Sequence, residues 1–288
     1  MNVARSPAEL ERVPRAVAIG TFDGVHVGHR AVLGAALAAG RRPTVVTFDP
    51  HPRTVLGRGV ELLATLERRL ELLADAGIEE TLVVEFTREL ASLAPEQFAR
   101  EYLVSIGAEV VAAGVGFRFG RDRGGDLELL RSLGLDVRQV PLVEGVSSTR
   151  IRQLVHASDV TAAARLLGRP VEVEGTVVDG DHRGAGLGFP TANLDVPAHL
   201  LVPGFGIYAG AVGDRRAAIS IGVNPHYGGT ERRVEAFLLD WSGDLYGRRL
   251  VVEVWRHLRD ERAFADEAEL VEQIARDVEE TRAAVRPS

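Results

Sequence analysis

Two histidines three positions apart, His26 and His29, stand in a glycine-rich segment whose pattern is typical of a phosphate site. A short apolar run, residues 16–20, precedes the segment, and an alanine- and leucine-rich stretch, residues 30–39, follows it. The pattern predicts a strand, a turn and a helix that begins near the histidines. Backbone N–H groups and the positive end of the helix dipole converge at such a start, which favours an anion such as a nucleotide phosphate.

The spacing of the two histidines lets both imidazoles face the same side of the helix start. Their N–H groups can then follow the charge that develops on a transferring phosphoryl group. Gly20, Gly24 and Gly28 let the backbone approach a ligand closely or adopt a positive φ. A metal-binding pair and two ordinary surface histidines are the alternatives, and no third metal ligand lies nearby in the sequence.

Two further polar segments belong to the first half of the chain. Residues 47–52 place Asp49 and His51 between prolines at the end of a second predicted strand, where an ordinary turn is the alternative. Residues 147–152 combine three hydroxyl side chains with two arginines ahead of a helical pattern. They predict a helix N-cap, and the same groups could also clamp a phosphate.

The second half contains a glycine-rich loop, residues 183–188, followed by Pro190, Thr191 and Asn193. Such a loop can surround phosphates with backbone N–H groups, or it can be a simple hairpin. Thr191 and Asn193 alternate on a predicted strand, so their oxygens face one side and suit Mg²⁺. Glu235, in an otherwise apolar strand, could be a residue of the barrel rim or a general base.

Strands and helices alternate in the first half. We expect strands at 16–20, 44–48, 81–85, 110–113 and 137–140, with helices at 28–39, 66–76, 95–106 and 125–133. This order predicts a doubly wound, mainly parallel sheet whose ligands bind at the carboxyl ends of the strands. The charged run at residues 67–69 is expected to be solvated surface.

Short β-type runs dominate after residue 168, at 171–178, 206–212, 217–223, 234–240 and 250–256. Glycine and proline separate them, which predicts a small antiparallel β-barrel. An amphipathic helix from about 267 to 285 follows the barrel. We therefore expect an α/β domain over residues 1–166 and a β-barrel domain over residues 167–288.

The composition limits the classes of function. The 288 residues include no cysteine, which excludes disulfides, thiolate catalysis and zinc-thiolate sites. The net charge of −7 gives no basic footprint for nucleic acid. The first residues lack the apolar run of a signal peptide and no segment is long and apolar enough to span a membrane, so we expect a cytoplasmic enzyme without a membrane partner. Self-association cannot be read from the chain.

The first-half segments together resemble the nucleotidylyl transferase superfamily with its His-x-Gly-His signature. More closely, they resemble the N-terminal module of the bacterial bifunctional riboflavin kinase/FAD synthetase family, over 17–30, 48–52, 114–126 and 147–152. The resemblance implies a Rossmann-like domain that adenylylates FMN with ATP and releases pyrophosphate. It assigns catalysis to His26 and His29. The implied ATP-binding residues are Gly20, Phe22, Asp23, Gly24, His26, Gly28, His29, Ser147, Ser148, Thr149 and Arg152, and the implied FMN-binding residues are Phe48, Asp49, Pro50, His51 and Phe117.

The second half resembles the riboflavin kinase domain of the same family, with matches at 188–193, 206–209, 222–225, 234–235 and 244–247. The resemblance implies a six-stranded flavokinase barrel with a C-terminal helix that phosphorylates riboflavin with ATP and Mg²⁺. Glu235 would be the base for the riboflavin 5′-hydroxyl, and Arg259 would help to hold the flavin. Thr191 and Asn193 would hold the metal. The implied ATP-binding residues are Gly184, Gly186, Gly188, Pro190, Thr191 and Asn193.

One position departs from the family pattern. Gly116 stands where this family normally carries Asp or Asn, ahead of Phe117. Besides the bifunctional enzyme, two alternatives therefore stay open: a riboflavin kinase whose adenylyltransferase module is impaired, and a flavin- or nucleotide-sensing protein without turnover.

Overall fold

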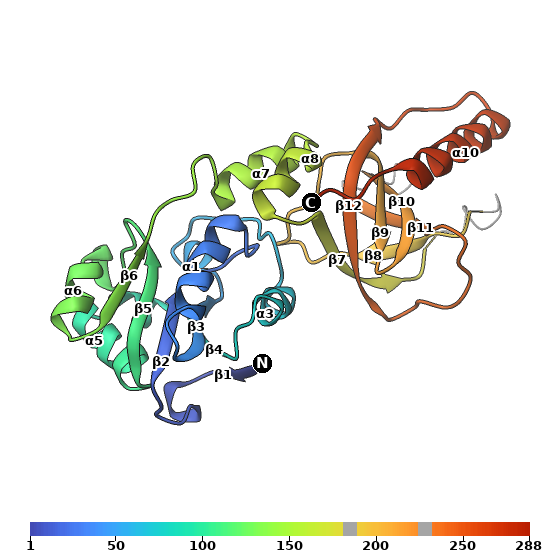
Figure 1. Ribbon diagram of the computed structural model, residues 1–288. Coiled ribbons are helices and arrows are strands. Elements are labelled where there is room, and N and C mark those ends of the chain that lie inside the picture. Colours follow the sequence, from blue (N-terminus) through green and yellow to red (C-terminus); the bar gives the residue numbers. More distant parts are fainter. Residues whose placement is uncertain (181–188, 224–231) are drawn as a thin grey trace. The chain divides into compact units, whose positions relative to one another are not determined.

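The computed structural model describes residues 1–180, 189–223 and 232–288 (Figure 1). Contacts within the chain form two compact units. The first contains residues 1–60 and 66–146, and the second contains residues 61–65 and 147–288. Each unit has its own buried core, as expected for two domains.

The first unit is built on a six-stranded sheet with the order β1-β4-β3-β2-β5-β6, in which all described pairs are parallel. The strands are β1 (Asn2–Ala4), β2 (Arg15–Ile19), β3 (Arg42–Asp49), β4 (Glu80–Glu85), β5 (Ala108–Gly114) and β6 (Asp136–Val140). All five predicted strands are confirmed. The edge strand β1 is additional, and its three residues are too few to show a period.

Helices cover both faces of this sheet, so the doubly wound arrangement is confirmed (Figure 1). Helices α1 (Val27–Leu37) and α3 (Leu66–Asp75) bury their apolar side chains with Ala16 and Ala18 on one face. Helices α5 (Pro95–Ala99) and α6 (Leu127–Ser132) pack with Val17 and Ile19 on the other. Because β2 is covered on both sides, all five of its residues are buried. Short helices α2 (Pro52–Val55) and α4 (Arg88–Ser92) lie in the connections.

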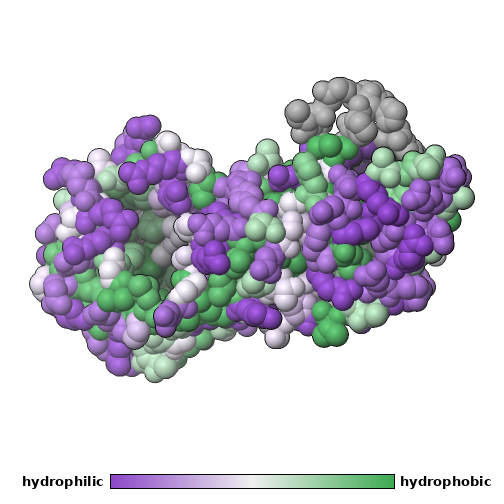
Figure 2. Space-filling model, turned by 90° about the horizontal axis from the view of Figure 1, so that it is seen from above, coloured by the Kyte–Doolittle hydropathy of each residue, from purple (hydrophilic) through white to green (hydrophobic). Residues whose placement is uncertain are grey.

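The position of β2 in the sheet determines where a ligand can bind. Its neighbours are β3 on one side and β5 on the other, so the strand order reverses there. Open α/β sheets bind ligands at such a reversal, beyond the carboxyl ends of the strands. The His26–His29 segment follows β2 directly. Seen from above, the first unit has a hollow whose walls include hydrophobic side chains (Figure 2).

The second unit is a closed six-stranded barrel with the order β10-β11-β8-β7-β12-β9 and antiparallel pairing. Its strands are β7 (Val171–Val178), β8 (Ala192–Asp195), β9 (Gly206–Val212), β10 (Arg215–Val223), β11 (Arg232–Leu238) and β12 (Arg249–Arg259). Buried residues alternate along β10 and β11, so one face of each strand fills the barrel. The predicted barrel is confirmed.

Within the described residues, the second unit also contains helices α7 (Ser148–His156), α8 (Val160–Leu167) and α10 (Glu267–Ala283). Helices α7 and α8 contribute buried side chains to the barrel core, so both pack with this unit. The C-terminal helix α10 contacts the outer face of β9 and β10, in agreement with the prediction. The predicted domain boundary between residues 166 and 167 remains a prediction.

Candidate functional site

The two histidines of the first unit lie against each other at the start of α1. His26 is the N-cap residue, and its Nδ1 accepts a hydrogen bond of 3.2 Å from the backbone N–H of His29. The imidazole rings are stacked, with centroids 3.6 Å apart and planes 13° apart. The prediction that both rings share one side of the helix start is confirmed.

These contacts define the protons that the imidazoles can donate. Because Nδ1 of His26 accepts a hydrogen bond, a neutral His26 carries its proton on Nε2. Burial, with smaller contributions from His26 and Arg69, holds the pKa of His29 well below its ordinary value. His29 is therefore neutral near pH 7 and offers one N–H group. Its Nδ1 is buried without a hydrogen-bond partner within the part of the chain that the structure describes.

The turn before α1 adopts strained backbone conformations. Phe22 and Val25 have φ of +49° and +39°, in the left-handed region that side chains other than glycine rarely occupy. Gly24 has a φ of +79°. The ring of Phe22 meets that of His29 edge-on, with centroids 5.3 Å apart. Strain of this kind costs about 1–3 kcal/mol per residue and persists where surrounding contacts hold it.

Glycine at two predicted positions allows close packing in this turn. A Cβ on Gly28 would lie 3.2 Å from Cε1 of His26, and one on Gly20 would lie 3.4 Å from the ring of Phe22. Asp23 is buried beside them, with 2% of its surface exposed. The structure therefore brings together the predicted residues 20–29 in one turn.

Arg69 was missed as a site residue, and the expectation of solvated surface at residues 67–69 is wrong for it. Only 4% of its surface is exposed, and its Nη1 donates to the carbonyl oxygen of Thr21 at 2.8 Å. Helix α3 packs against the sheet, and Arg69 lies on its buried side together with Leu72 and Leu73. The helical period of the apolar side chains Leu72 and Leu73 could have indicated the buried face.

The loop after β3 begins with a cis peptide bond between Asp49 and Pro50. His51 is buried, and its Nδ1 accepts from the backbone N–H of Arg53 at 3.1 Å, which caps α2. The ring of Phe48 packs in the core against Phe86 and Phe98. The predicted FMN contacts of residues 48–51 stay predictions.

The departure at Gly116 has a backbone explanation. Gly116 has a φ of +79°, and the N–H of Phe117 donates to the carbonyl of Gly114 at 3.0 Å to close the turn. Glycine, asparagine and aspartate are the residues that tolerate this conformation best. No described atom lies within 4 Å of a Cβ built on Gly116. Glycine therefore suits this left-handed turn. The ring of Phe117 stacks with that of Phe119, with centroids 5.6 Å apart.

Substitutions at Gly116 are expected to separate backbone strain from side-chain volume. Gly116→Asn should leave the free energy of unfolding of the first unit within about 0.5 kcal/mol, because asparagine accepts a positive φ. Gly116→Val should lower it by about 1–2 kcal/mol, since a β-branched residue there is strained. Urea unfolding of both variants checks this. Equal stability of the two variants would contradict the assignment of the left-handed turn.

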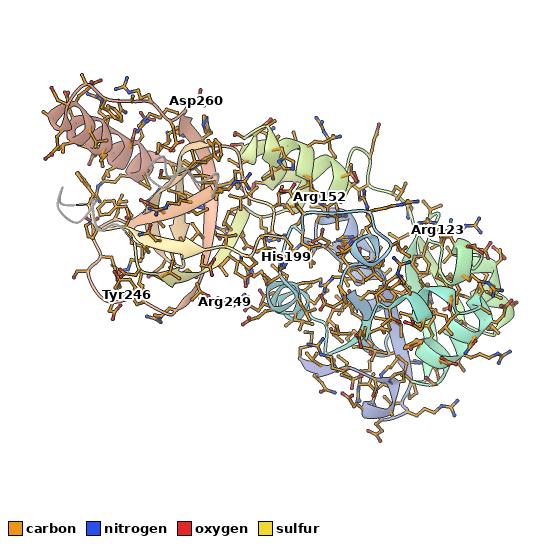
Figure 3. The ribbon with its side chains drawn as sticks, turned by 180° about the vertical axis from the view of Figure 1, so that it is seen from behind. Arg123, Arg152, His199, Tyr246, Arg249 and Asp260 are labelled. Carbon is orange, nitrogen blue, oxygen red and sulfur yellow. The ribbon has the colours of Figure 1, made fainter. Side chains whose placement is uncertain are left out.

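Residues 147–152 belong to the second unit. Ser147 is the N-cap of α7, with its side chain accepting from the N–H of Arg150 at 3.1 Å, so the predicted cap is confirmed. Arg152 lies on α7 (Figure 3), and its Nε donates to the carbonyl of Glu61 at 2.6 Å. The predicted contact of Ser147, Ser148, Thr149 and Arg152 with ATP stays a prediction.

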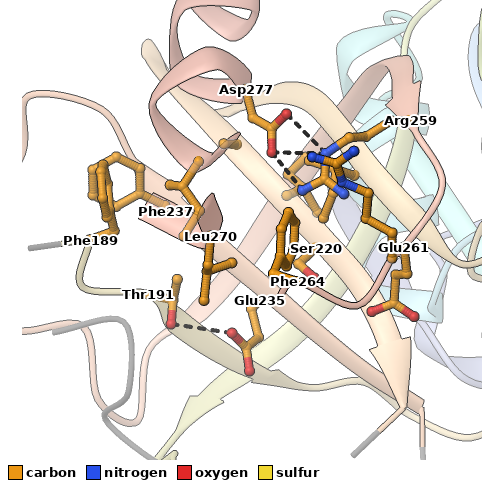
Figure 4. A pocket seen from close by; sticks show the side chains of 15 residues that line it. Phe189, Thr191, Ser220, Glu235, Phe237, Arg259, Glu261, Phe264, Leu270 and Asp277 are labelled. Atoms are coloured by element: carbon orange, nitrogen blue, oxygen red, sulfur yellow. Dashed lines mark hydrogen bonds and ion pairs between the residues drawn. The ribbon is translucent and has the colours of Figure 1, made fainter. Parts of the chain in front are cut away.

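In the barrel, three neighbouring strands bring polar side chains to one place. Glu235 on β11 lies opposite Asn193 of β8 and opposite Ser220 of β10. Thr191, one residue before β8, donates from Oγ1 to Oε2 of Glu235 at 3.4 Å (Figure 4). The fold of the barrel thus brings Thr191, which is 44 positions from Glu235 in the chain, within hydrogen-bond distance of it.

Glu235 and Thr191 line a cavity of about 300 Å³ between the outer face of the barrel and α10. Its walls combine aromatic and aliphatic side chains with charged groups around one end (Figure 4). The apolar part includes Phe189, Ile207, Phe237, Phe264, Leu270 and Ile274. A flat, largely apolar ring system with a polar tail fits such a lining.

Arg259 also lines this cavity, where a salt bridge fixes its guanidinium. Its Nη2 lies 2.8 Å from Oδ2 of Asp277, and its Nε lies 3.0 Å from Oδ1. Asp277 on α10 is 4% exposed and was missed by the sequence analysis. Asp277 lies among the buried residues of α10. A carboxylate within the apolar stripe of an amphipathic helix could have indicated a buried ion pair.

Glu261 is a second carboxylate near Glu235 that was not predicted. It lines the same cavity, and a Cβ on Gly222 would collide with its carboxylate. Burial is the main cause that raises the pKa of Glu261; the charge of Arg259 opposes the rise and that of Glu235 adds to it.

A second cavity of about 310 Å³ lies on the other side of Thr191, which lines both. Pro190, Asn193, Trp241 and Tyr246 contribute to its wall. The carboxamide of Asn193 occupies the space that a Cβ on Gly180 would fill. A hydroxyl and an amide oxygen beside a carboxylate form a donor set that fits Mg²⁺. The predicted glycines Gly184, Gly186 and Gly188 lie outside the described residues.

Residues 1–180, 189–223 and 232–288 contain no group of three or more His, Asp or Glu side chains arranged to hold a metal ion. Over those same ranges, no helix combines the length and apolar character that crossing a membrane requires.

Comparison with known proteins also divides the chain into two parts. The family model described as riboflavin kinase matches residues 167–285, and the one described as FAD synthetase matches residues 9–152. The chain is 33% identical to the bifunctional riboflavin kinase/FMN adenylyltransferase of Listeria monocytogenes, over 96% of this chain and 94% of that protein. It is 35% identical to the protein of that description from Escherichia coli, over 96% of both chains.

A solved structure from Streptococcus pneumoniae, described as a macrolide-efflux protein, superposes with a TM-score of 0.87 at 30% identity. The match covers 97% of this chain and 98% of that one. Both family models match this chain, and it is 33–35% identical to the Listeria monocytogenes and Escherichia coli relatives over 96% of its length. The chain therefore belongs to the bifunctional riboflavin kinase/FMN adenylyltransferase family.

Proposed function

We propose that this protein makes FAD in two steps, with the kinase chemistry in the barrel and adenylyl transfer in the first unit. Riboflavin and ATP give FMN and ADP, and FMN with a second ATP gives FAD and pyrophosphate. The observation that carries the proposal is the co-occurrence, in one chain, of the stacked His26–His29 turn and the Glu235–Thr191 pair beside an apolar cavity. The dependence on ATP favours a cytoplasmic location.

In the barrel, Glu235 is the general base. The riboflavin 5′-oxygen attacks the γ-phosphorus of ATP, the bond to the β,γ-bridging oxygen breaks, and the hydroxyl proton passes to Glu235. The first cavity takes the flavin ring, with Arg259 held by Asp277 at its polar end. The second takes ATP beside Thr191 and Asn193. These two residues would hold Mg²⁺, which neutralises phosphate charge when it is bound.

In the first unit, an FMN phosphate oxygen attacks the α-phosphorus of ATP and the bond to pyrophosphate breaks. No proton has to move, because a phosphate oxygen is already a competent nucleophile. Nε2–H of His26 and the single N–H of His29 donate to the oxygens on which charge develops. Keeping His29 neutral avoids a buried imidazolium when no substrate is bound.

The two alternatives are less well supported. Gly116 adopts a left-handed conformation that asparagine and aspartate also tolerate, so the departure at this position does not by itself favour an impaired adenylyltransferase. A protein that binds flavin without turnover needs no carboxylate to accept a proton from the substrate hydroxyl. Glu235 offers such a carboxylate beside Thr191.

Incubation of the protein with riboflavin, ATP and Mg²⁺, followed by chromatography of the flavins, tests the proposal. FMN and FAD together are the expected products. FMN alone would reject the adenylyltransferase assignment, and unchanged riboflavin would reject the kinase assignment.

A further inference from the structure

Arg69 is a buried cation under the His26–His29 turn, and neither reaction step described above uses it. It is 4% exposed, whereas its neighbour Arg68 forms an ion pair of 2.7 Å with Glu71 along the same helix. Burying a guanidinium costs several kcal/mol unless partners compensate it. A cation at this place therefore needs a role that justifies the cost.

The guanidinium joins two segments of the site. Its Nη1 donates to the carbonyl oxygen of Thr21 at 2.8 Å, and its Nη2 lies 3.4 Å from Oδ1 of Asp49. Thr21 belongs to the turn that leads to the histidines, and Asp49 opens the loop that follows β3. Nε of Arg69 is buried and has no hydrogen-bond partner within the ranges that the structure describes.

The carbonyl that Arg69 binds is the one before the strained residue. The same Thr21 oxygen also accepts from Oγ1 of Thr47 at 3.1 Å, so two donors fix the peptide that joins Thr21 to Phe22. Phe22 follows with its left-handed φ of +49°, and its ring contacts His29. A rotation of this peptide would move the ring and release His29 from its place beside His26.

We propose that Arg69 is a positioning residue for adenylyl transfer: its bond to the Thr21 carbonyl holds the Phe22 turn, and thereby His29, in the reactive arrangement. Through Asp49 the same side chain ties the loop after β3 to the turn. The inference rests on the proposed adenylyltransferase function and adds to it a residue from outside the four motif segments.

Kinetics of full-length variants test this role, with FAD formation from FMN measured as kcat and KM separately. Arg69→Met removes both bonds but keeps the length of the side chain, and it is expected to lower kcat about 100-fold, because small misplacements of catalytic groups cost that much. Arg69→Lys can still reach one acceptor and should recover at least about a tenth of the wild-type rate. The matched control Arg68→Met should behave as wild type.

Riboflavin phosphorylation by the same samples should stay unchanged, which reports that the second unit is intact. Cooperative urea unfolding of the first unit, which contains residue 69, reports whether each variant is folded there. Thr47→Val removes the second donor to the Thr21 carbonyl without changing side-chain shape, and about a 10-fold loss of kcat is expected. The Thr47→Val variant tests the inference if Arg69→Met fails to fold.

Three results would overturn the inference: an Arg69→Met kcat within about threefold of wild type, an effect on KM alone, or an Arg69→Lys variant no better than Arg69→Met. A Thr47→Val variant with wild-type kcat would overturn it as well. Failure of the proposed function is distinguishable, since the wild-type protein itself would then form no FAD from FMN.

Discussion

Glu235→Gln is expected to lower the rate of FMN formation by about 10³-fold, the typical contribution of a general base. Glutamine keeps the size of the side chain and still offers an oxygen to Oγ1 of Thr191, which donates to Glu235 at 3.4 Å in the structure. It cannot take the proton of the riboflavin hydroxyl. Initial rates of FMN formation, with saturating ATP and Mg²⁺, measure the loss.

Two controls accompany this variant. Riboflavin binding, followed by the quenching of its fluorescence, should remain, because the apolar wall of the cavity is untouched. Glu253→Gln changes a glutamate of β12 that pairs with Arg286, outside the lining of the cavity, and should leave FMN formation unchanged. A Glu235→Gln rate within about tenfold of wild type would remove Glu235 from the role of base.

His29→Gln should lower the rate of FAD formation from FMN by about 10²–10³-fold, the usual cost of losing one donor to a developing charge. The variant keeps the backbone N–H of residue 29, which donates to Nδ1 of His26, so the start of α1 should survive. Initial rates of FAD formation measure the effect.

The partner variant His26→Asn separates capping from catalysis. Asparagine is a good N-cap residue and replaces the Nδ1 acceptor, but it does not extend as far as Nε2. A comparable fall in FAD formation with unchanged thermal stability is expected. Kinase activity of both histidine variants should equal that of wild type. FAD formation at the wild-type rate in either variant would contradict the assignment of the stacked pair.

Much of this architecture follows from the sequence because the determining signals are local. The alternation of apolar strands with helical patterns predicted all five longer strands of the first unit, and glycine and proline punctuation predicted the barrel. The histidine turn was predictable for the same reason: its residues are adjacent, and a helix start puts them on one side.

What sequence reasoning missed depends on tertiary contacts. Arg69 stands in a charged run, and only the packing of α3 against the sheet turns it inward. The burial of Asp277 is explained by its salt bridge with Arg259, which is 18 residues away in the chain. The pairing of Glu235 with Asn193 depends on a strand register that spacing alone could not provide.

We propose that two independent active sites, one in each unit, carry out consecutive reactions. FAD formation from riboflavin by an equimolar mixture of the Glu235→Gln and His29→Gln proteins tests it most directly. Each variant alone should form almost no FAD from riboflavin, whereas the mixture should form it readily, because FMN made by the His29→Gln protein is adenylylated by the Glu235→Gln protein. A mixture as inactive as the separate variants would contradict the account.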